Sequence, residues 1–231
     1  MASEKVRDRF DRSARDAAPD DFLRQIKRTV DGEPVDDAQI ALLIDAIVDG
    51  LTLASDDVLL DLCCGNGALT DRLFARCRGG VGVDFSNELI AVARTHFERP
   101  PGRTYLARDV EAYLATADPT PFTKALCSFS FQYLSPASAL RVLASIHERF
   151  GRIATIVLAD LPDKARMHAF FYPGVYVAGM EDDYESDIGM WRTPDELRAL
   201  AATAGWDCEI RYMPAAYHAA HYRFNAVLAR R

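Results

Sequence analysis

Asp57-Val-Leu-Leu-Asp61-Leu-Cys-Cys-Gly65-Asn-Gly67 decides the fold of this chain. An apolar run that ends in small residues predicts a buried strand, a tight turn and then a helix. Because Gly65 and Gly67 have no Cβ, a ligand can lie against the backbone there, and the first amides of the helix face it. The next predicted strand ends in Gly80-Val-Gly-Val-Asp84. An acidic residue near this offset, roughly 20 residues on, meets ribose hydroxyls in nucleotide-binding βαβ units, so the chain is predicted to bind a nucleoside cofactor.

Strands and helices alternate from residue 57 onward. We predict strands at 57–62, 80–84, 103–107, 122–128 and 152–159, with helices between them at 67–77, 87–98, 110–117 and 136–149. Two more strands, at 206–213 and 221–229, are joined by a short loop and are therefore antiparallel neighbours. The fold class is thus α/β, with helices on both faces of a Rossmann-like seven-stranded sheet that is mainly parallel and has an antiparallel last strand.

The segments outside this alternation predict an N-terminal arm and an insertion. Two short helices before residue 30, a turn at 29–34 and a helix that ends at Gly50 predict a helical arm or lid over residues 1–50. Residues 51–231 then form the cofactor-binding domain. Its segment 160–192, rich in aromatic and then in acidic residues, is predicted to cover the substrate.

Composition limits the classes of partner. The 231 residues carry a net charge of −7, which argues against binding to nucleic acid or an anionic membrane surface. No apolar run approaches the ~20 residues of a membrane span. The N-terminal Met-Ala-Ser-Glu-Lys lacks the apolar region of a signal peptide, so we expect a cytoplasmic protein. The five cysteines show no metal-ligand spacing, and no metal is predicted.

The pattern resembles the class I S-adenosylmethionine-dependent methyltransferases, in particular a branch that acts on small molecules. The resemblance covers residues 57–231 and adds three landmarks to the glycine-rich turn and Asp84: Arg108-Asp109-Val110, the segment 127–133, and a terminal hairpin with the only antiparallel strand. It implies S-adenosyl-L-methionine as cofactor and S-adenosyl-L-homocysteine as product. The cofactor-binding residues that it implies are Asp61, Cys63, Gly65, Asn66, Gly67, Asp84, Phe85, Ser86, Asp109, Val110, Ser128, Phe129 and Tyr133.

Several of these residues have specific expected roles. Asp84 should accept two ribose hydroxyls, because Ser86 is the better cap for the following helix. The resemblance places Asp61 near the methionine ammonium and Asp109 near the adenine. Cys63 stands where the family has a glycine, and a negative φ is expected for it. Lys27, Arg28 and Thr29 either close over the methionine carboxylate or form a solvated helix face.

Catalytic candidates come from the loops on the ligand side of the sheet. An imidazole with an ordinary pKa can accept a proton at neutral pH. The alternative for any one of them is a hydrogen-bonded loop histidine without a catalytic role. The candidates are His168, His218, His221 and Tyr172.

The expected function is methyl transfer to a hydroxyl or amine of a small molecule, such as a sugar or a secondary metabolite. The acceptor would lie under residues 1–34 and 160–192, and the protein would be a monomer or a homodimer. One alternative is a non-catalytic S-adenosylmethionine-binding regulatory subunit. Another is an NAD(P)-dependent oxidoreductase, although Thr70 stands where that fingerprint needs a third glycine or alanine.

Overall fold

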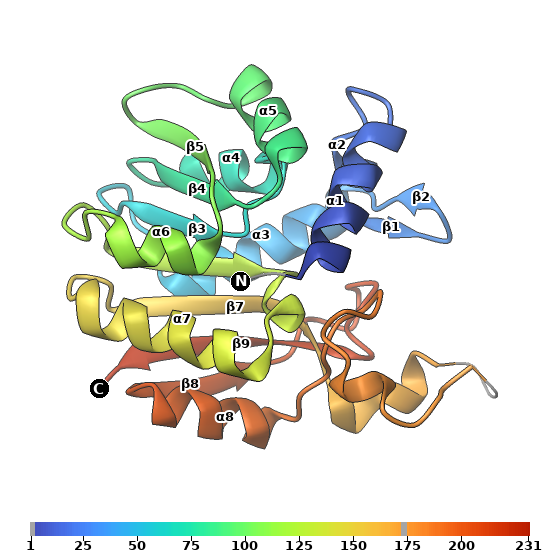
Figure 1. Ribbon diagram of the computed structural model, residues 1–231. Coiled ribbons are helices and arrows are strands. Elements are labelled where there is room, and N and C mark those ends of the chain that lie inside the picture. Colours follow the sequence, from blue (N-terminus) through green and yellow to red (C-terminus); the bar gives the residue numbers. More distant parts are fainter. Residues whose placement is uncertain (1–2, 172–174) are drawn as a thin grey trace.

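A seven-stranded sheet forms the centre of the protein. The computed structural model describes residues 3–171 and 175–231. Strand order is β5-β4-β3-β6-β7-β9-β8, and only β9 runs antiparallel to its neighbours β7 and β8 (Figure 1). The predicted fold class is therefore confirmed. The strands are β3 (Leu59–Leu62), β4 (Gly80–Asp84), β5 (Arg103–Ala107), β6 (Lys124–Ser128), β7 (Thr155–Pro162), β8 (Trp206–Arg211) and β9 (Arg223–Arg230).

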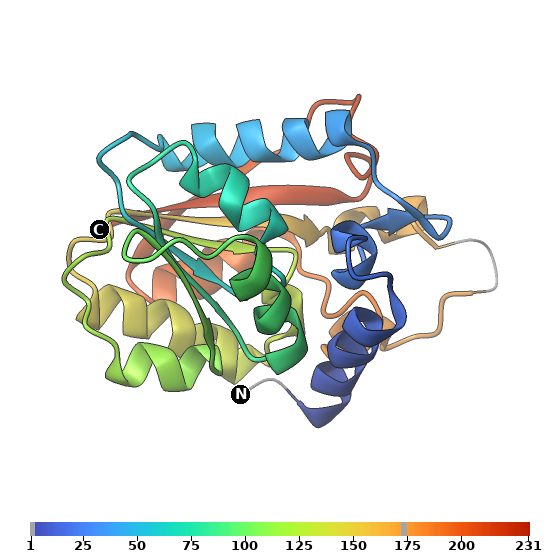
Figure 2. The same ribbon diagram turned by 90° about the horizontal axis from the view of Figure 1, so that it is seen from above.

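Helices cover both faces of this sheet. The helices are α3 (Asp37–Leu51), α4 (Ala68–Phe74), α5 (Asn87–His96), α6 (Val110–Thr116), α7 (Pro136–Arg149) and α8 (Pro194–Thr203). Successive strand residues point to opposite faces. Leu60 packs with side chains of α6, α7 and α8, whereas Leu59 packs with those of α3, α4 and α5. Figure 2 shows α3 on one face and α6 and α7 on the other.

Local sequence explains where the helices begin. The Ser135 side chain accepts a hydrogen bond from the Ser138 amide, and Pro136 occupies the first turn of α7. At α8, Thr193 and Glu196 form a reciprocal capping box. Both helix starts agree with the sequence pattern.

The N-terminal arm lies at the carboxyl ends of the parallel strands (Figure 1). It comprises α1 (Glu4–Asp16), α2 (Phe22–Gln25) and a hairpin of β1 (Thr29–Val30) and β2 (Glu33–Pro34). By contrast, α3 buries its apolar face against the sheet. A domain boundary at residue 50 stays a prediction.

Three short 3₁₀ helices complete the described chain: η1 (Phe131–Tyr133) after β6, and η2 (Lys164–Ala169) and η3 (Met180–Asp182) in the insertion. Across residues 3–171 and 175–231, no helix has both the length and the apolar character needed to cross a bilayer.

Candidate functional site

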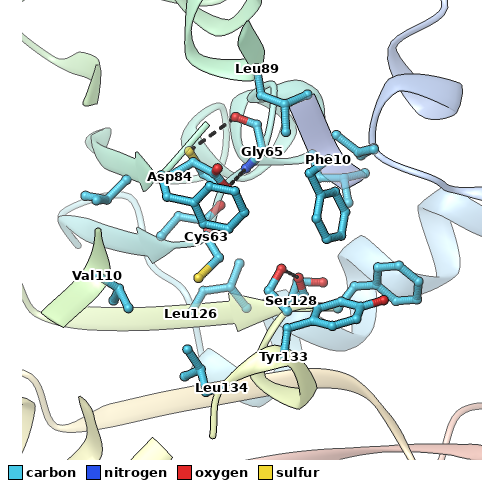
Figure 3. A pocket seen from close by; sticks show the side chains of 18 of the residues that line it. Phe10, Cys63, Gly65, Asp84, Leu89, Val110, Leu126, Ser128, Tyr133 and Leu134 are labelled. Carbon is cyan, nitrogen blue, oxygen red and sulfur yellow. Dashed lines mark hydrogen bonds between the residues drawn. The ribbon is translucent and has the colours of Figure 1, made fainter. Parts of the chain in front are cut away.

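A pocket lies where β3, β4 and β6 end, with the arm as its roof (Figure 3). The arm contributes Val6, Phe10, Ile26 and Arg28 to its lining. This is the edge of a parallel sheet at which α/β folds bind ligands. Of the predicted cofactor residues, the lining includes Asp61, Cys63, Gly65, Asp84, Phe85, Asp109, Val110, Ser128, Phe129 and Tyr133.

The turn after β3 depends on left-handed backbone. Gly65 has φ +57° and Gly67 has φ +79°. Cys63 has φ +63°, so the expectation of a negative φ was wrong. The left-handed residue reverses the chain while the Cys64 amide still donates to the Val83 carbonyl at 3.0 Å. A non-glycine residue in this region costs roughly 1–2 kcal/mol, and such strain is tolerated where the surrounding structure fixes the turn.

Asp84 is held in the pocket wall by two backbone amides. Its Oδ2 accepts from the Gly65 amide and its Oδ1 from the Ser86 amide, each at 2.9 Å. The residue is 6% exposed, and burial raises the pKa of its carboxyl to about 6 against the opposing effect of these bonds. Ser86 caps α5 through its hydroxyl. One lone pair on each oxygen of Asp84 therefore stays available to a ligand.

Asp61 is a second buried carboxylate beside the same turn. Its Oδ2 accepts the Thr70 hydroxyl at 2.6 Å, and 3% of the residue is exposed. Burial, together with the charge of Asp84, raises the pKa of Asp61 to about 7 although the Thr70 bond opposes this. Two carboxyls with raised pKa values in one pocket favour a cationic ligand, because a positive charge would restore their ordinary ionisation.

Three predicted residues of the turn region lie outside the lining. Asn66 donates from Nδ2 to the Phe22 carbonyl and to Gln25 Oε1, both at 2.8 Å, and so ties the turn to the arm. Gly67 begins α4, and a Cβ there would lie 2.8 Å from the Tyr105 ring. Ser86 serves α5. Their contact with a cofactor stays a prediction.

The three arm residues predicted to contact the methionine carboxylate lie in different places. Arg28 enters the pocket, where Nη1 forms a buried ion pair with Asp160 and Nη2 donates to Ser128 Oγ at 3.2 Å. Lys27 instead faces a neighbouring groove, and Thr29 lies in β1. Of the three, only Arg28 reaches the pocket, so contacts of Lys27 and Thr29 with a methionine carboxylate stay predictions.

Asp160 joins Arg28 to Arg223 in a buried cluster. It lies at an irregularity of β7 with φ +63°, and its carbonyl accepts from the Arg223 guanidinium. Burial raises the pKa of the Asp160 carboxyl, but attraction to Arg28 and Arg223 outweighs it and holds the pKa below its ordinary value. Sequence analysis missed Asp160 and Arg223, because no local motif marks a pair 132 residues apart such as Arg28 and Asp160.

Aromatic side chains close the roof of the pocket. The Phe10 ring lies near Tyr133 (Figure 3), which it meets edge-on with 5.4 Å between centroids. It meets Phe85 in the same way at 6.4 Å. Val6, one turn earlier in α1, is fully buried. Their spacing of four residues was the available signal, since it places both on one helix face.

The predicted catalytic residues do not meet in this pocket. His168 and His221 are exposed, and the backbone amide of half-buried His218 donates to Gln39 Oε1 at 2.7 Å. Burial lowers the pKa of His218. Tyr172 lies outside the described residues. A catalytic role for any of the four stays a prediction. Within the described ranges, no group of three or more His, Cys, Asp or Glu side chains is placed to hold a metal ion.

Comparison with known proteins agrees with this geometry. Residues 59–150 match a family described as a methyltransferase domain. This match and the fold together support a class I S-adenosylmethionine-dependent methyltransferase. The predicted family, enzyme class and cofactor are therefore confirmed at the level of domain and fold.

Individual relatives of this methyltransferase domain are distant or matched over short stretches. Ubiquinone biosynthesis O-methyltransferase of Nitrosomonas europaea is 27% identical over 164 residues, which cover 70% of this chain and 67% of that protein. An uncharacterized methyltransferase of Schizosaccharomyces pombe is 50% identical, but over only 48 residues, 21% of this chain and 18% of that one. Magnesium protoporphyrin IX methyltransferase from Synechocystis, solved with bound SAH, superposes with a TM-score of 0.65 at 14% identity and 98% coverage of both chains, and supports the fold.

Proposed function

We propose that this protein transfers the methyl group of S-adenosylmethionine to a hydroxyl or amine of a small molecule. The observation that carries the proposal is the pair of buried carboxylates, Asp61 and Asp84, beside a glycine-rich turn in a largely apolar pocket. The resemblance to an O-methyltransferase of ubiquinone biosynthesis supports a small acceptor.

The pocket offers a suitable partner to each part of the cofactor. Asp84 has one free lone pair on each oxygen for the two ribose hydroxyls. Phe85 and Val110 provide apolar walls for the adenine. Asp109 uses Oδ1 to cap α6 and pairs through Oδ2 with Arg7 at 3.1 Å, so we assign the adenine contact to the backbone near Val110.

Charge also fits. When bound, S-adenosylmethionine supplies an electrophilic methyl group on a sulfonium and also carries an ammonium group. Both charges are positive, and Asp61 and Asp84 have pKa values of about 7 and about 6. A bound cation would lower both pKa values and add electrostatic attraction that is strong in a buried site.

The residues around the reacting position would act mainly by alignment. Ser128 and Tyr133 follow β6 at the pocket edge, and Phe10 seals the pocket from above. Alignment of two bound reactants can contribute about 7–11 kcal/mol to lowering the barrier. A hydroxyl acceptor also needs a base. His218 is the candidate near Asp160, because its lowered pKa keeps it neutral at physiological pH.

Calorimetric titration with S-adenosylmethionine, S-adenosylhomocysteine and NADH tests the cofactor. We expect the first two to bind and NADH not to bind. Phenols, sugars and amines would then be screened for the gain of one methyl group by mass spectrometry. Binding of NADH alone would refute the proposal, whereas cofactor binding without turnover of any acceptor would favour the regulatory subunit.

A further inference from the structure

A second cavity, distinct from the cofactor pocket, lies between α1, the segment after α2, and Asp187 of the insertion. Its volume is about 540 Å³, within the range of small-molecule sites. Basic side chains dominate its lining: Lys5, Arg9, Arg12, Arg24 and Lys27. We call this cavity the basic groove.

The basic groove and the cofactor pocket share α1 as a wall. Lys5, Arg9 and Arg12 recur on one face of the helix, while Val6 and Phe10 face the cofactor pocket. The Arg9 guanidinium lies 6.0 Å from the Tyr133 ring centroid. Tyr133 itself lines the pocket and lies against Phe10 (Figure 3). A molecule in the groove would therefore lie one side chain away from the place where methyl transfer is proposed.

A carboxylate of the protein already occupies part of the groove. Asp187 lies 3.1 Å from Arg9 Nε and 3.9 Å from Lys27 Nζ, although 82% of its side chain is exposed. Arg9 is held in position by the Ser186 and Glu185 carbonyls, to which its other nitrogens donate. Burial lowers the pKa of Lys27, while Asp187 raises it. The groove is thus built so that cations converge on one acidic group.

Much of the positive charge in the groove is not neutralised. The lining itself holds five cations and two carboxylates, Asp16 and Asp187, in a chain of net charge −7. Arg24 pairs with Asp21 at 2.8 Å. Lys5 and Arg12, in contrast, form no ion pair or hydrogen bond with any residue that the structure describes. An anion could therefore bind to Lys5 and Arg12 without first displacing an acidic side chain of the protein.

The surroundings restrict the size of such an anion. Glu181, Asp182, Asp183 and Glu185 precede Asp187 in the insertion. These charges would repel a long polyanion, whereas a compact acid could bind at Lys5 and Arg12 without reaching them.

We propose that the basic groove binds a carboxylate or phosphate group of the methyl acceptor, so that the acceptor is a small organic acid. This inference rests on the proposed methyltransferase function. In the reaction, an oxygen or nitrogen lone pair of the acceptor forms the bond to the methyl carbon, and the electron pair of the broken carbon–sulfur bond stays on sulfur. The acceptor proton leaves to a base or to water, and the acid group in the groove takes no part.

Direct titration with two small anions, pyrophosphate and citrate, tests the groove. We expect saturable binding of at least one of them at low salt, and weaker binding at high salt. Arg12→Gln should weaken it about two- to fivefold, as removal of an exposed ion pair does, and Lys5→Gln with Arg12→Gln should weaken it further. The preferred anion distinguishes a phosphate from a carboxylate acceptor.

Arg15→Gln is the matched control. It removes the same charge from the same helix, but Arg15 lies outside the groove and pairs with Glu88 at 3.5 Å. No saturable binding, or equal losses in Arg12→Gln and Arg15→Gln, would overturn the inference. Tighter binding of a short single-stranded RNA than of either anion would also overturn it.

The titrations are repeated with and without S-adenosylhomocysteine. Absence of cofactor binding would refute the proposed function, and the anion titration of the unliganded protein would still report on the groove. If methyl transfer is found, 4-hydroxybenzoate should be a better acceptor than 4-hydroxybenzamide, which differs only in lacking the acid group. An equal or better rate with the amide would contradict an acidic acceptor.

Discussion

Asp84→Asn separates cofactor binding from folding more cleanly than other changes in the pocket. The side chain keeps its shape, but it loses its charge and one acceptor oxygen. Asp84 accepts the Gly65 and Ser86 amides at 2.9 Å each, so an asparagine can satisfy only one of them with its oxygen. We expect a large loss of cofactor affinity with little net change in stability.

The two magnitudes follow from the structure. An unsatisfied buried amide costs about 1–3 kcal/mol. Against this, the carboxyl has its pKa raised from 3.8 to about 6 in the folded protein, so ionising it at pH 8 costs about 3 kcal/mol that asparagine does not incur. These effects on the free energy of unfolding nearly cancel. For the cofactor, loss of one charge-assisted bond and weakening of the other amounts to about 3 kcal/mol, or about a hundredfold in Kd.

Calorimetry with S-adenosylhomocysteine and urea denaturation at pH 8 measure the two quantities. Asp45→Asn, at an exposed position on α3, is the matched control and should change neither. A loss of affinity below about threefold in a variant of unchanged stability would refute the assignment of Asp84 to the ribose.

Three further outcomes follow from the charges of the site. S-adenosylmethionine should bind more weakly as pH falls below the pKa values of about 7 for Asp61 and about 6 for Asp84, because the protonated carboxyls no longer attract its positive charges; Kd measured from pH 5 to 8 checks this. Asp61→Asn should stabilise the unliganded protein at pH 8 by up to about 4 kcal/mol but not near pH 3, because the folded protein resists ionisation of Asp61 only above pH 3.8, the pKa of this carboxyl in the unfolded chain. Equal shifts of the urea midpoint at both pH values would exclude this. Arg28→Met should lower the free energy of unfolding by about 3 kcal/mol, since it leaves Asp160 with Arg223 alone. Arg24→Met, which removes a side chain that is 41% exposed, should cost less than about 1 kcal/mol in the same assay.

The parts of the site that sequence predicted are those set by short-range rules. The order strand, glycine turn and helix follows from apolar runs and small residues, and Ser86 was identified as the helix cap because side-chain capping is local. The same reasoning failed at Cys63, where the need to reverse the chain overrides the ordinary preference for negative φ. It also missed Asp160, because its partners come from the arm and from β9.

The histidines show another limit. Their loops were assigned to the ligand side of the sheet from topology alone, which does not say how a side chain points. In the structure His168 and His221 face solvent and His218 lies against Gln39 of α3. Orientation within a loop depends on packing between distant segments, and no spacing rule reports it.

The hydrogen bonds from Asn66 to Phe22 and Gln25 hold one part of the arm more firmly than the other. They fasten α2 to the glycine-rich turn, and Arg28 fastens the segment after α2 to Asp160. Helix α1 meets the pocket through Phe10 and Val6, and its polar contacts at the pocket rim are the Arg7–Asp109 ion pair and the Ser86 hydroxyl, which donates to Asp11. We therefore expect α1 alone to move when the pocket opens, with a hinge at residues 17–21, where Pro19 separates the two helices. Ligand exchange would then require separation of the Phe10 contacts and of the polar contacts of Arg7, Arg9 and Asp11, whereas the buried pair of Arg28 and Asp160 could stay intact.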